Sequence, residues 1–206
     1  AEVLGCYAYL LDHRNGASML SIPFGHTIDA LCWTLGEFTE LSASLATRRP
    51  QVRQSESGAM LRSDVADQIA VSGILESGAL ASVHFRGGLS RGTHFQWEIN
   101  GTEGDLVVRS GGGHIQMLPL SLSGARGSDT ALTELSVPAE FDPIAGDALV
   151  ENSFAASVAR AYTHLAKDLR SGTQTLPDFD AAVRRHHMLE AIERSAATGI
   201  RQSYGA

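Results

Sequence analysis

The chain has 206 residues, of which 43% are hydrophobic and 19% charged, and it carries a net charge of −7 with a pI of about 5.6. This acidic balance argues against a nucleic-acid-binding protein, and two cysteines are too few for a disulfide framework or a structural zinc site. The longest apolar stretch, residues 3–11, is too short to cross a bilayer and lacks the basic lead-in of a signal peptide. We therefore expect a cytoplasmic protein without a membrane segment, and the missing initiator Met indicates a fragment.

The first part of the chain predicts a strand, a helix and a second strand. Residues 3–11 favour a buried strand because they are almost continuously apolar. A helix is expected between Gly25 and Gly36, with one apolar stripe made of Ile28, Leu31, Cys32 and Leu35. Phe38–Ala46 alternates between apolar and polar residues, which is typical of a half-buried strand. Residues 48–62 are polar and irregular, so we expect an exposed loop there.

Strands dominate the middle of the chain. Gln68–Leu75 and residues 79–86 predict a hairpin around a glycine-containing turn. In the second of these strands Ala81, Val83 and Phe85 share one face, and Ser82, His84 and Arg86 share the other. Further strands are expected at residues 95–99, 106–109, 114–122 and 132–137, with a loop at 123–130.

Helical spacing returns in the last part of the chain. One helix is expected along Phe154, Val158, Ala161, Leu165 and Leu169, ending at Gly172. A second is expected after Pro177 with Asp178 as its cap, an apolar stripe of Val183, Leu189, Ile192 and Ala196, and an end at Gly199. A run of strands followed by helices predicts an α+β fold with a large open, mainly antiparallel sheet and helices packed on one face. The other face, which carries His84 and Arg86, is then a solvent-facing surface, a ligand floor or a subunit interface.

Several common binding motifs are missing from the sequence. There is no G-x-G-x-x-G and no G-x-x-x-x-G-K-[ST], and the glycine run at residues 111–113 precedes a predicted strand rather than a helix. We therefore expect no dinucleotide site in this chain. The eight histidines lack metal-ligand spacing, and His186 and His187 are adjacent on a predicted helix, where they point to different sides. No metal site is expected either.

The segment from Ser21 to Asp29 is the most informative one for function. We expect Gly25 to allow a tight turn into the helix, with His26 near the helix start and Asp29 in its first turn. An imidazole in such a place can bond a substrate hydroxyl or transfer a proton, with Asp29 three residues later as its neighbour. The alternative is purely structural: a capping histidine and a carboxylate that compensates the helix dipole.

Three stretches together resemble one family. Residues 25–29 (G-H-T-I-D) with Leu35, Gly36 and Glu37, then residues 97–104 (W-E-I-N-G-T-E-G), then residues 176–181 (L-P-D-F-D-A) with the helix up to Gly199, follow the order seen in the glucose–fructose oxidoreductase/inositol dehydrogenase (Gfo/Idh/MocA) family. The resemblance implies a C-terminal domain of the dihydrodipicolinate-reductase-like type. On this basis residues 1–206 are one substrate-binding and dimerisation domain, and the family's N-terminal Rossmann domain is absent from the chain.

The resemblance also implies a chemistry. NAD or NADP is held mainly by the N-terminal domain, a sugar or polyol is bound by the C-terminal one, and the sheet forms a homo-oligomer interface. His26 and Asp29 then become catalytic candidates, and Gly25, His84 and Arg86 substrate-binding candidates. The isolated chain is expected to be inactive.

One position departs from the family pattern. Dehydrogenases of the family commonly carry an Asp four residues before the histidine, and this chain has Ile22 there. An isoleucine can neither orient an imidazole nor accept a proton. Residues 12–37 are similar to the galactose-repressor-like branch, so a non-catalytic sugar-sensing or protein-interaction domain remains the alternative to an oxidoreductase.

Overall fold

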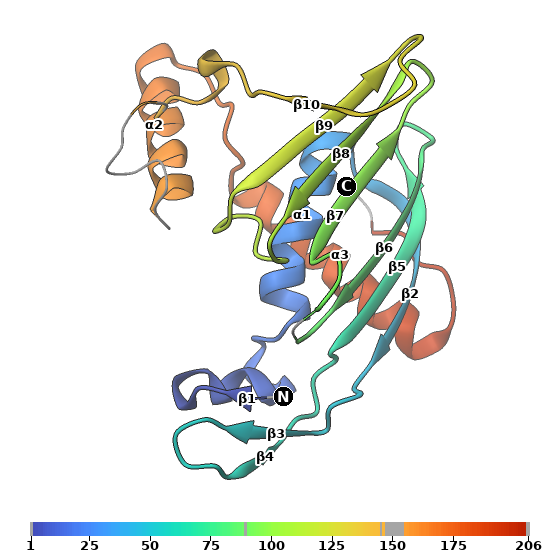
Figure 1. The fold of residues 1–206 in the computed structure, drawn as a ribbon. Helices are drawn as coiled ribbons and strands as arrows, with labels where there is room; N and C mark the ends of the chain where they lie inside the picture. Colours follow the sequence, from blue (N-terminus) through green and yellow to red (C-terminus); the bar gives the residue numbers. More distant parts are fainter. Residues whose placement is uncertain (1, 89, 145, 147–154, 205–206) are drawn as a thin grey trace. The chain divides into compact units, whose positions relative to one another are not determined.

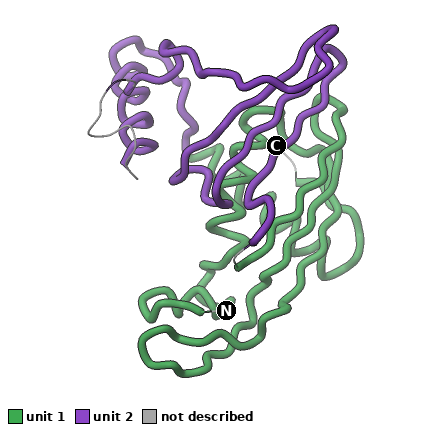
Figure 2. Tube along the Cα trace, viewed as in Figure 1, with its two compact units in different colours: residues 1–88, 179–206 green, residues 89–178 purple. Residues whose placement is uncertain are grey.

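The computed structural model describes residues 2–88, 90–144, 146 and 155–204. The chain divides into two compact units, the first made of residues 1–88 and 179–206 and the second of residues 89–178 (Figure 2). Helices and antiparallel sheets occur in both units, and the sheets are open. The predicted α+β class is therefore confirmed. Phe154, the expected start of one helix, lies outside the described residues.

The first unit contains two sheets and most of the buried side chains. Its strands are β1 (Glu2–Val3), β2 (Phe38–Ala46), β3 (Gln51–Gln54), β4 (Met60–Arg62), β5 (Gln68–Leu75) and β6 (Leu80–Arg86). Its helices are the 3₁₀ helices η1 (Gly5–Leu11) and η2 (His13–Asn15), the π-helix η3 (Leu20–Phe24), α1 (Gly25–Leu35) and α3 (Phe179–Thr198) (Figure 1). Strands pair in the orders β2–β5–β6, which is antiparallel, and β1–β3–β4.

Helix α3 covers one face of the β2–β5–β6 sheet. The hydroxyl of Ser195 accepts a hydrogen bond from the backbone N–H of Ala43 in β2 at 3.0 Å. The core of this unit consists of fully buried side chains that meet between the sheet and the helices: Phe24, Ile28, Phe38, Leu41, Ile69, Val71, Leu75, Met188 and Ile192. Alternation along β5 explains which of its side chains join this core, because Ile69 and Val71 are buried while the residue between them and the one after them are exposed.

The second unit is built on one four-stranded antiparallel sheet. Its elements are β7 (Phe95–Asn100), β8 (Gly104–Ser110), β9 (Leu120–Arg126), β10 (Thr133–Leu135), the 3₁₀ helix η4 (Ala139–Phe141) and α2 (Ala156–Ser171). The strand order is β10–β9–β8–β7. Helix α2 ends at Gly172, whose φ of 66° is a left-handed conformation that favours glycine.

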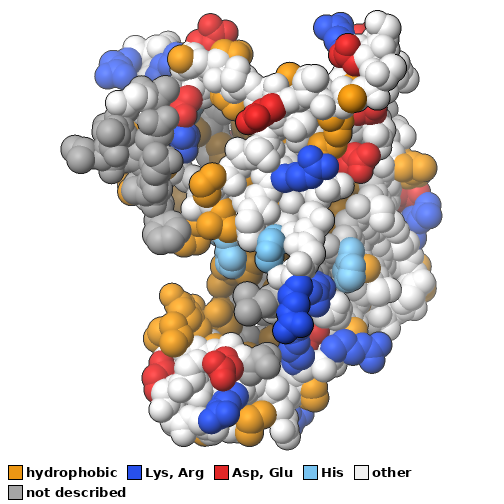
Figure 3. All heavy atoms as spheres, viewed as in Figure 1, with side chains coloured by type: hydrophobic (Ala, Val, Ile, Leu, Met, Phe, Trp, Pro, Cys, Tyr) orange, Lys and Arg blue, Asp and Glu red, His pale blue; other side chains and the backbone are white. Residues whose placement is uncertain are grey.

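The N-terminal prediction is wrong. Residues 3–11 form not a buried strand but a two-residue strand followed by η1. Tyr7 and Tyr9 are half exposed, and apolar side chains gather on the surface over η1 (Figure 3). A residue distant in the chain holds the start of η1, because the Gly5 N–H donates to both carboxylate oxygens of Glu56 at 3.0 and 2.9 Å. A run of apolar residues cannot distinguish this arrangement from a strand.

The loop expected at residues 48–62 is also wrong. It contains the hairpin β3–β4, in which Val52 pairs with Leu61, and β3 pairs in parallel with β1 through Val3 and Gln54. These polar strands form because a distant strand completes their hydrogen bonding. Polarity alone therefore misled the prediction.

Two later boundaries differ as well. A strand was expected at 114–122 and a loop at 123–130, but β9 spans Leu120–Arg126 and pairs with β8 along its length. On α3, Val183 is exposed, whereas Met188 and Ser195 are buried together with the predicted Leu189 and Ile192. The predicted stripe missed the side of the helix that faces β2, because a serine and an arginine occupy part of it.

Candidate functional site

The segment that carries His26 is one continuous helical stretch. The π-helix η3 leads directly into α1, and the Phe24 N–H donates to the carbonyl of Met19 at 3.0 Å, five residues earlier. Pro23, which has no N–H to donate, lies within this π-turn. Because helical turns already precede Gly25, His26 does not lie at a free helix start and Asp29 does not lie in the first turn. Short π-turns of this kind are frequent at functional sites.

The prediction that Gly25 allows a tight turn into the helix is wrong. Its φ of −52° and ψ of −48° are ordinary right-handed helix values. A Cβ atom added there would lie 3.6 Å from the Leu20 carbonyl oxygen, an ordinary contact. No tight turn requires glycine at this place, and a role for Gly25 in substrate binding stays a prediction.

Helix α1 is anchored to the sheet through an aromatic pair. The Phe24 ring is fully buried and meets the Phe85 ring of β6 edge-on, with centroids 5.9 Å apart. Phe85 therefore points to the helix-covered face of the sheet. Strand alternation places His84 and Arg86 on the opposite face. The structure thus does not bring these two residues together with His26, although their role as ligands on that other face stays a prediction.

Arg185, Asp29 and Glu37 form a group of ion pairs, here called the arginine clamp, that ties α1 to α3. Arg185 of α3 has a side chain only 11% exposed, and its Nε donates to Asp29 Oδ1 at 3.0 Å. Its Nη2 and Nη1 donate to the two oxygens of Glu37 at 2.8 and 3.1 Å. A two-pronged pairing of this kind is the strongest form of charged hydrogen bond.

The clamp extends to the C-terminal segment and shifts several pKa values. The Tyr204 hydroxyl donates to Glu37 at 2.8 Å and accepts from the Phe38 N–H at 3.0 Å. Burial alone would raise the pKa of Glu37, but the hydrogen bonds and charge of Arg185 outweigh burial and hold that pKa below its usual value. Burial raises the pKa of the nearby Cys32 thiol to about 12, so this cysteine is a protonated core residue.

His26 itself is exposed on the outer side of α1. Asp29 is bound by Arg185, and within the described part of the chain no hydrogen bond joins Asp29 to His26. The predicted orientation of the imidazole by Asp29 is therefore not seen. Asp29 instead positions the helix that presents His26. The catalytic roles of the two residues stay predictions.

Little in the sequence indicates the role of Arg185. It lies in an Arg-Arg-His-His run that is typical of a solvated helix face, and its partners Asp29 and Glu37 are distant in the chain. Only the buried position of Arg185, which periodicity could not place, would have suggested the clamp.

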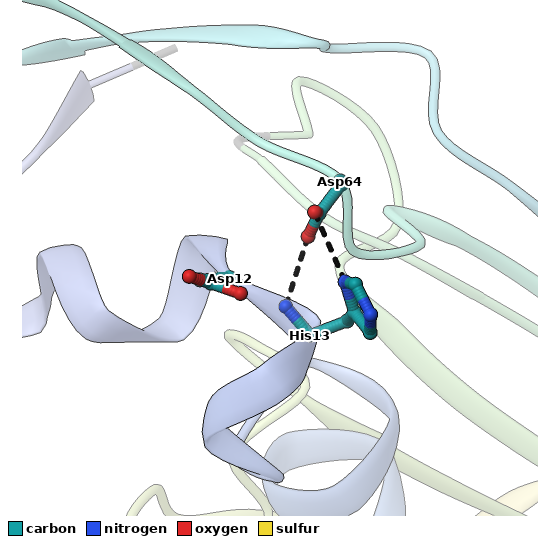
Figure 4. Close-up of side chains that lie close together, drawn as sticks. All are labelled: Asp12, His13 and Asp64. Carbon is teal, nitrogen blue, oxygen red and sulfur yellow. Dashed lines mark hydrogen bonds and ion pairs between the residues drawn. The ribbon is translucent and has the colours of Figure 1, made fainter.

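One side-chain cluster in the first unit has metal-ligand residue types. The carboxylates of Asp12 and Asp64 and the imidazole of His13 lie close together (Figure 4). Asp64 accepts from the His13 backbone N–H at 2.8 Å and lies 3.0 Å from its Nδ1. Asp12, however, is neutralised by the guanidinium of Arg14, with Nη2 2.6 Å from Oδ2, and this pairing lowers the pKa of Asp12 to about 2. A cation already serves one carboxylate, so the cluster does not fit a metal ion well.

Among the described residues, none of the helices combines the length and the hydrophobicity that a membrane span requires.

Comparison with known proteins defines the family. The family model described as the Gal80p C-terminal domain matches residues 1–110, more than half of the chain, and the chain therefore belongs to this family. The resemblance to the C-terminal domain of the glucose–fructose oxidoreductase/inositol dehydrogenase family is confirmed with it.

Relatives include both a regulator and an enzyme. The chain is 31% identical over 124 residues to the galactose/lactose metabolism regulatory protein GAL80 of Kluyveromyces lactis, an alignment that covers 55% of this chain and 27% of that protein. It is 28% identical over 200 residues to the dehydrogenase aclE of Aspergillus oryzae, covering 94% of this chain and 50% of that protein. The chain thus spans half or less of the curated relatives it matches here.

A solved structure shows the same fold. Levoglucosan dehydrogenase in complex with NADH and L-sorbose superposes with a TM-score of 0.71 at 25% sequence identity. The match covers 93% of this chain and 52% of that one.

Proposed function

We propose that this chain is the substrate-binding and oligomerisation domain of an NAD(H)- or NADP(H)-dependent oxidoreductase that acts on a sugar or polyol. The observation that carries the proposal is the exposed imidazole of His26 on a helix whose inner side is fixed by Phe24 and Arg185. A rigidly held group is what positioning of a reacting hydroxyl requires. The match to the dehydrogenase aclE over 94% of the chain supports this reading, as does the structure of a dehydrogenase with NADH and a sugar.

In this proposal each residue has a defined part. His26 bonds the substrate hydroxyl and can accept or donate its proton. Asp29 is a positioning residue, because its carboxylate is bound to Arg185 and ties α1 to α3. Ile22, 37% exposed and four residues before His26, offers the substrate an apolar contact.

We do not place the nicotinamide cofactor on the described residues of this chain. The glycine run at residues 111–113 leads into a turn and then β9 rather than into a helix, so no helix N-terminus faces a phosphate there. Helix α1 is preceded by a π-turn instead of a glycine-rich loop. The cofactor site therefore belongs to another part of the protein in this proposal, and we derive no step through it.

Steady-state turnover tests the proposal. The full-length protein is incubated with NAD⁺ or NADP⁺ and a panel of sugars and polyols, and formation of the reduced nicotinamide is followed by absorbance. We expect turnover on at least one polyhydroxylated substrate and none by residues 1–206 alone. A full-length protein that binds the cofactor but oxidises no member of the panel contradicts the proposal.

A different observation favours a second candidate function. Ile22 and Trp33, which is 61% exposed, lie on the same side of the helix as His26 and add apolar side chains around it, while the Asp29 carboxylate on that side is already paired with Arg185. Such a surface suits a non-catalytic sugar sensor or protein-binding regulator, in keeping with the GAL80 match. Ile22→Asp separates the two functions, because a carboxylate beside the imidazole leaves a regulator without turnover and raises the activity of an enzyme whose proton transfer is limiting.

The outer face of the β2–β5–β6 sheet supports the oligomer in the same proposal. Ser72 and Ser82 pair across this face, and its end residue Leu80 is 83% exposed. Small side chains let two such faces approach closely. We expect sedimentation of the full-length protein to give a dimer, and Ser72→Arg to give a monomer while the surface variant Arg194→Ala stays dimeric.

A further inference from the structure

We propose that the first unit holds a second binding site, for a small aliphatic amine, in a cavity that no feature of the oxidoreductase proposal uses. The cavity has a volume of about 580 Å³, which falls within the range of small-molecule sites. Neither His26 nor Asp29 lines it. The lining comes from η2 and η3, the end of β2, the segment before β5, and α3.

One side of the cavity is a single face of α3. His186, Glu190 and Glu193 follow one another at spacings of four and three residues, which places them along one side of the helix. The buried side chain of Leu189 lies beside them in the lining. Glu190 is only loosely paired with Arg194, at 3.9 Å and with both side chains more than half exposed, so its carboxylate remains available to a ligand.

The other side carries the Asp64–His13 pair shown in Figure 4. Asp64 accepts the backbone N–H of His13 at 2.8 Å and lies 3.0 Å from Nδ1 of the same residue. These two contacts fix the Asp64 carboxylate at the cavity wall. The third carboxylate thus comes from a different element than the two glutamates on α3.

The lining has a definite charge. It includes three carboxylates, from Asp64, Glu190 and Glu193, together with the imidazoles of His13 and His186, and it includes no lysine or arginine. An anionic ligand would meet only repulsion from these groups, whereas an ammonium group offers each of them a charged donor. A neutral hydroxyl offers the carboxylates a donor without a compensating charge.

The remaining lining explains why the ligand is an organic amine rather than a bare metal ion. Leu20, Leu45 and Val65 add apolar surface for a hydrocarbon chain, and the hydroxyls of Ser18 and Thr47 add neutral acceptors. A volume of this size leaves a single ion without ligands on most sides. The combination fits a linear diamine or polyamine, with methylenes over the apolar wall and ammonium groups at the carboxylates.

Calorimetric titration of the full-length protein tests the site. The probes are 1,4-diaminobutane and spermidine, and the matched neutral probe is 1,4-butanediol. We expect the amines to bind and the diol of equal length not to. Glu193→Gln and Asp64→Asn should each weaken amine binding about tenfold, the usual effect of removing a charged hydrogen-bond partner.

The control is Glu76→Gln, which removes the same charge from an exposed turn of the same unit that does not line the cavity. It should leave the affinity unchanged, and unfolding curves of all variants report whether the fold is kept. Ala66→Leu, which fills the cavity without changing charge, should also abolish binding. The proposal is overturned if neither amine binds at millimolar concentration, if the diol binds as well as the diamine, or if Glu76→Gln weakens binding as much as Glu193→Gln.

Discussion

The two units differ in what holds them together. The first unit buries most of the large apolar side chains of the described chain, and it adds one charged clamp between α1 and α3. In the second unit the buried apolar residues, among those described, are Val107, Ile144 and Ala156. Its order comes from strand pairing and from polar contacts around Asp168. The helix that carries His26 is therefore held by side-chain packing between segments distant in the chain, whereas the second unit relies on local hydrogen bonds.

The largest expected effect comes from breaking the clamp. Arg185→Met removes the cation from Glu37, whose side chain is 17% exposed, and should lower the free energy of unfolding by about 3 kcal/mol, the scale for a buried charge left without its partner. Arg185→Lys should lose less, because it keeps the charge but not the two-pronged geometry. Urea unfolding at pH 7 measures both, with Arg194→Ala, in an exposed pair, as the control within about 0.5 kcal/mol.

The same variant has a defined pH dependence. The pKa of Glu37 lies below its usual value of 4.5, so this group stabilises the folded chain above about pH 4.5, and the stabilisation is lost as the pH falls through the lower folded pKa. Once Glu37 is protonated it no longer needs a cation. The difference between wild type and Arg185→Met should therefore shrink as the pH falls below 4.5. A difference that grows on acidification contradicts the assignment.

Truncating the core should have an effect of similar size. Ile192 is fully buried between α3 and the sheet, and Ile192→Ala should lower the free energy of unfolding by roughly 3 kcal/mol through lost burial and the cavity left behind. The matched change on α2 is Val158→Ala, at a side chain that is 55% exposed, with an expected effect below about 0.5 kcal/mol. Equal losses for the two variants in denaturant unfolding would falsify the contrast between the units.

A smaller effect is expected at the polar centre of the second unit. Asp168 accepts from the Thr173 hydroxyl at 2.7 Å and from the backbone N–H groups of Thr175 and Leu176 at 2.8 and 3.1 Å. The Thr173 bond is the main cause that lowers the pKa of Asp168 to about 2, against a usual value of 3.8. These contacts close the loop that follows α2.

Acid titration checks this role. Because the folded pKa is depressed, Asp168 stabilises the fold above about pH 4, and this contribution is lost between about pH 4 and 2. Asp168→Asn should lower the thermal midpoint at pH 7, and the gap to wild type should close across that window. A gap that is the same at pH 7 and pH 2 would show that the carboxylate charge is not what matters.

Local periodicity predicted the parts of the fold that rest on local patterns. Helix α1 and β2 occur where apolar spacing placed them, and the β5–β6 hairpin was predicted from alternation and a glycine turn. The 3₁₀ helix η1 and the β3–β4 hairpin were missed because distant partners hold them, Glu56 for the first and β1 for the second. Local patterns thus predict helices and hairpins that form from neighbouring residues, but not the segments that distant partners hold.

The candidate site, too, could be predicted only where it depends on local sequence patterns. His26 was expected near the helix start and instead lies within a continuous helical stretch, with its side chain exposed. The prediction that Asp29 orients the His26 imidazole was wrong, because the Asp29 carboxylate binds Arg185, 156 residues away. The separation of His84 and Arg86 from His26 follows from strand alternation and the Phe24–Phe85 contact, which needed the packing of η3 on β6 to be known.

The most direct test of the central claim is the turnover of His26→Ala in the full-length protein on a polyol that the wild type oxidises. The side chain is exposed, so unfolding should be nearly unchanged, while kcat should fall by roughly a hundredfold or more, the usual contribution of a positioned acid–base group. His187→Ala, at an exposed histidine of α3, should retain wild-type kcat. A folded His26→Ala protein with undiminished kcat would contradict the account and leave His26 as a surface residue.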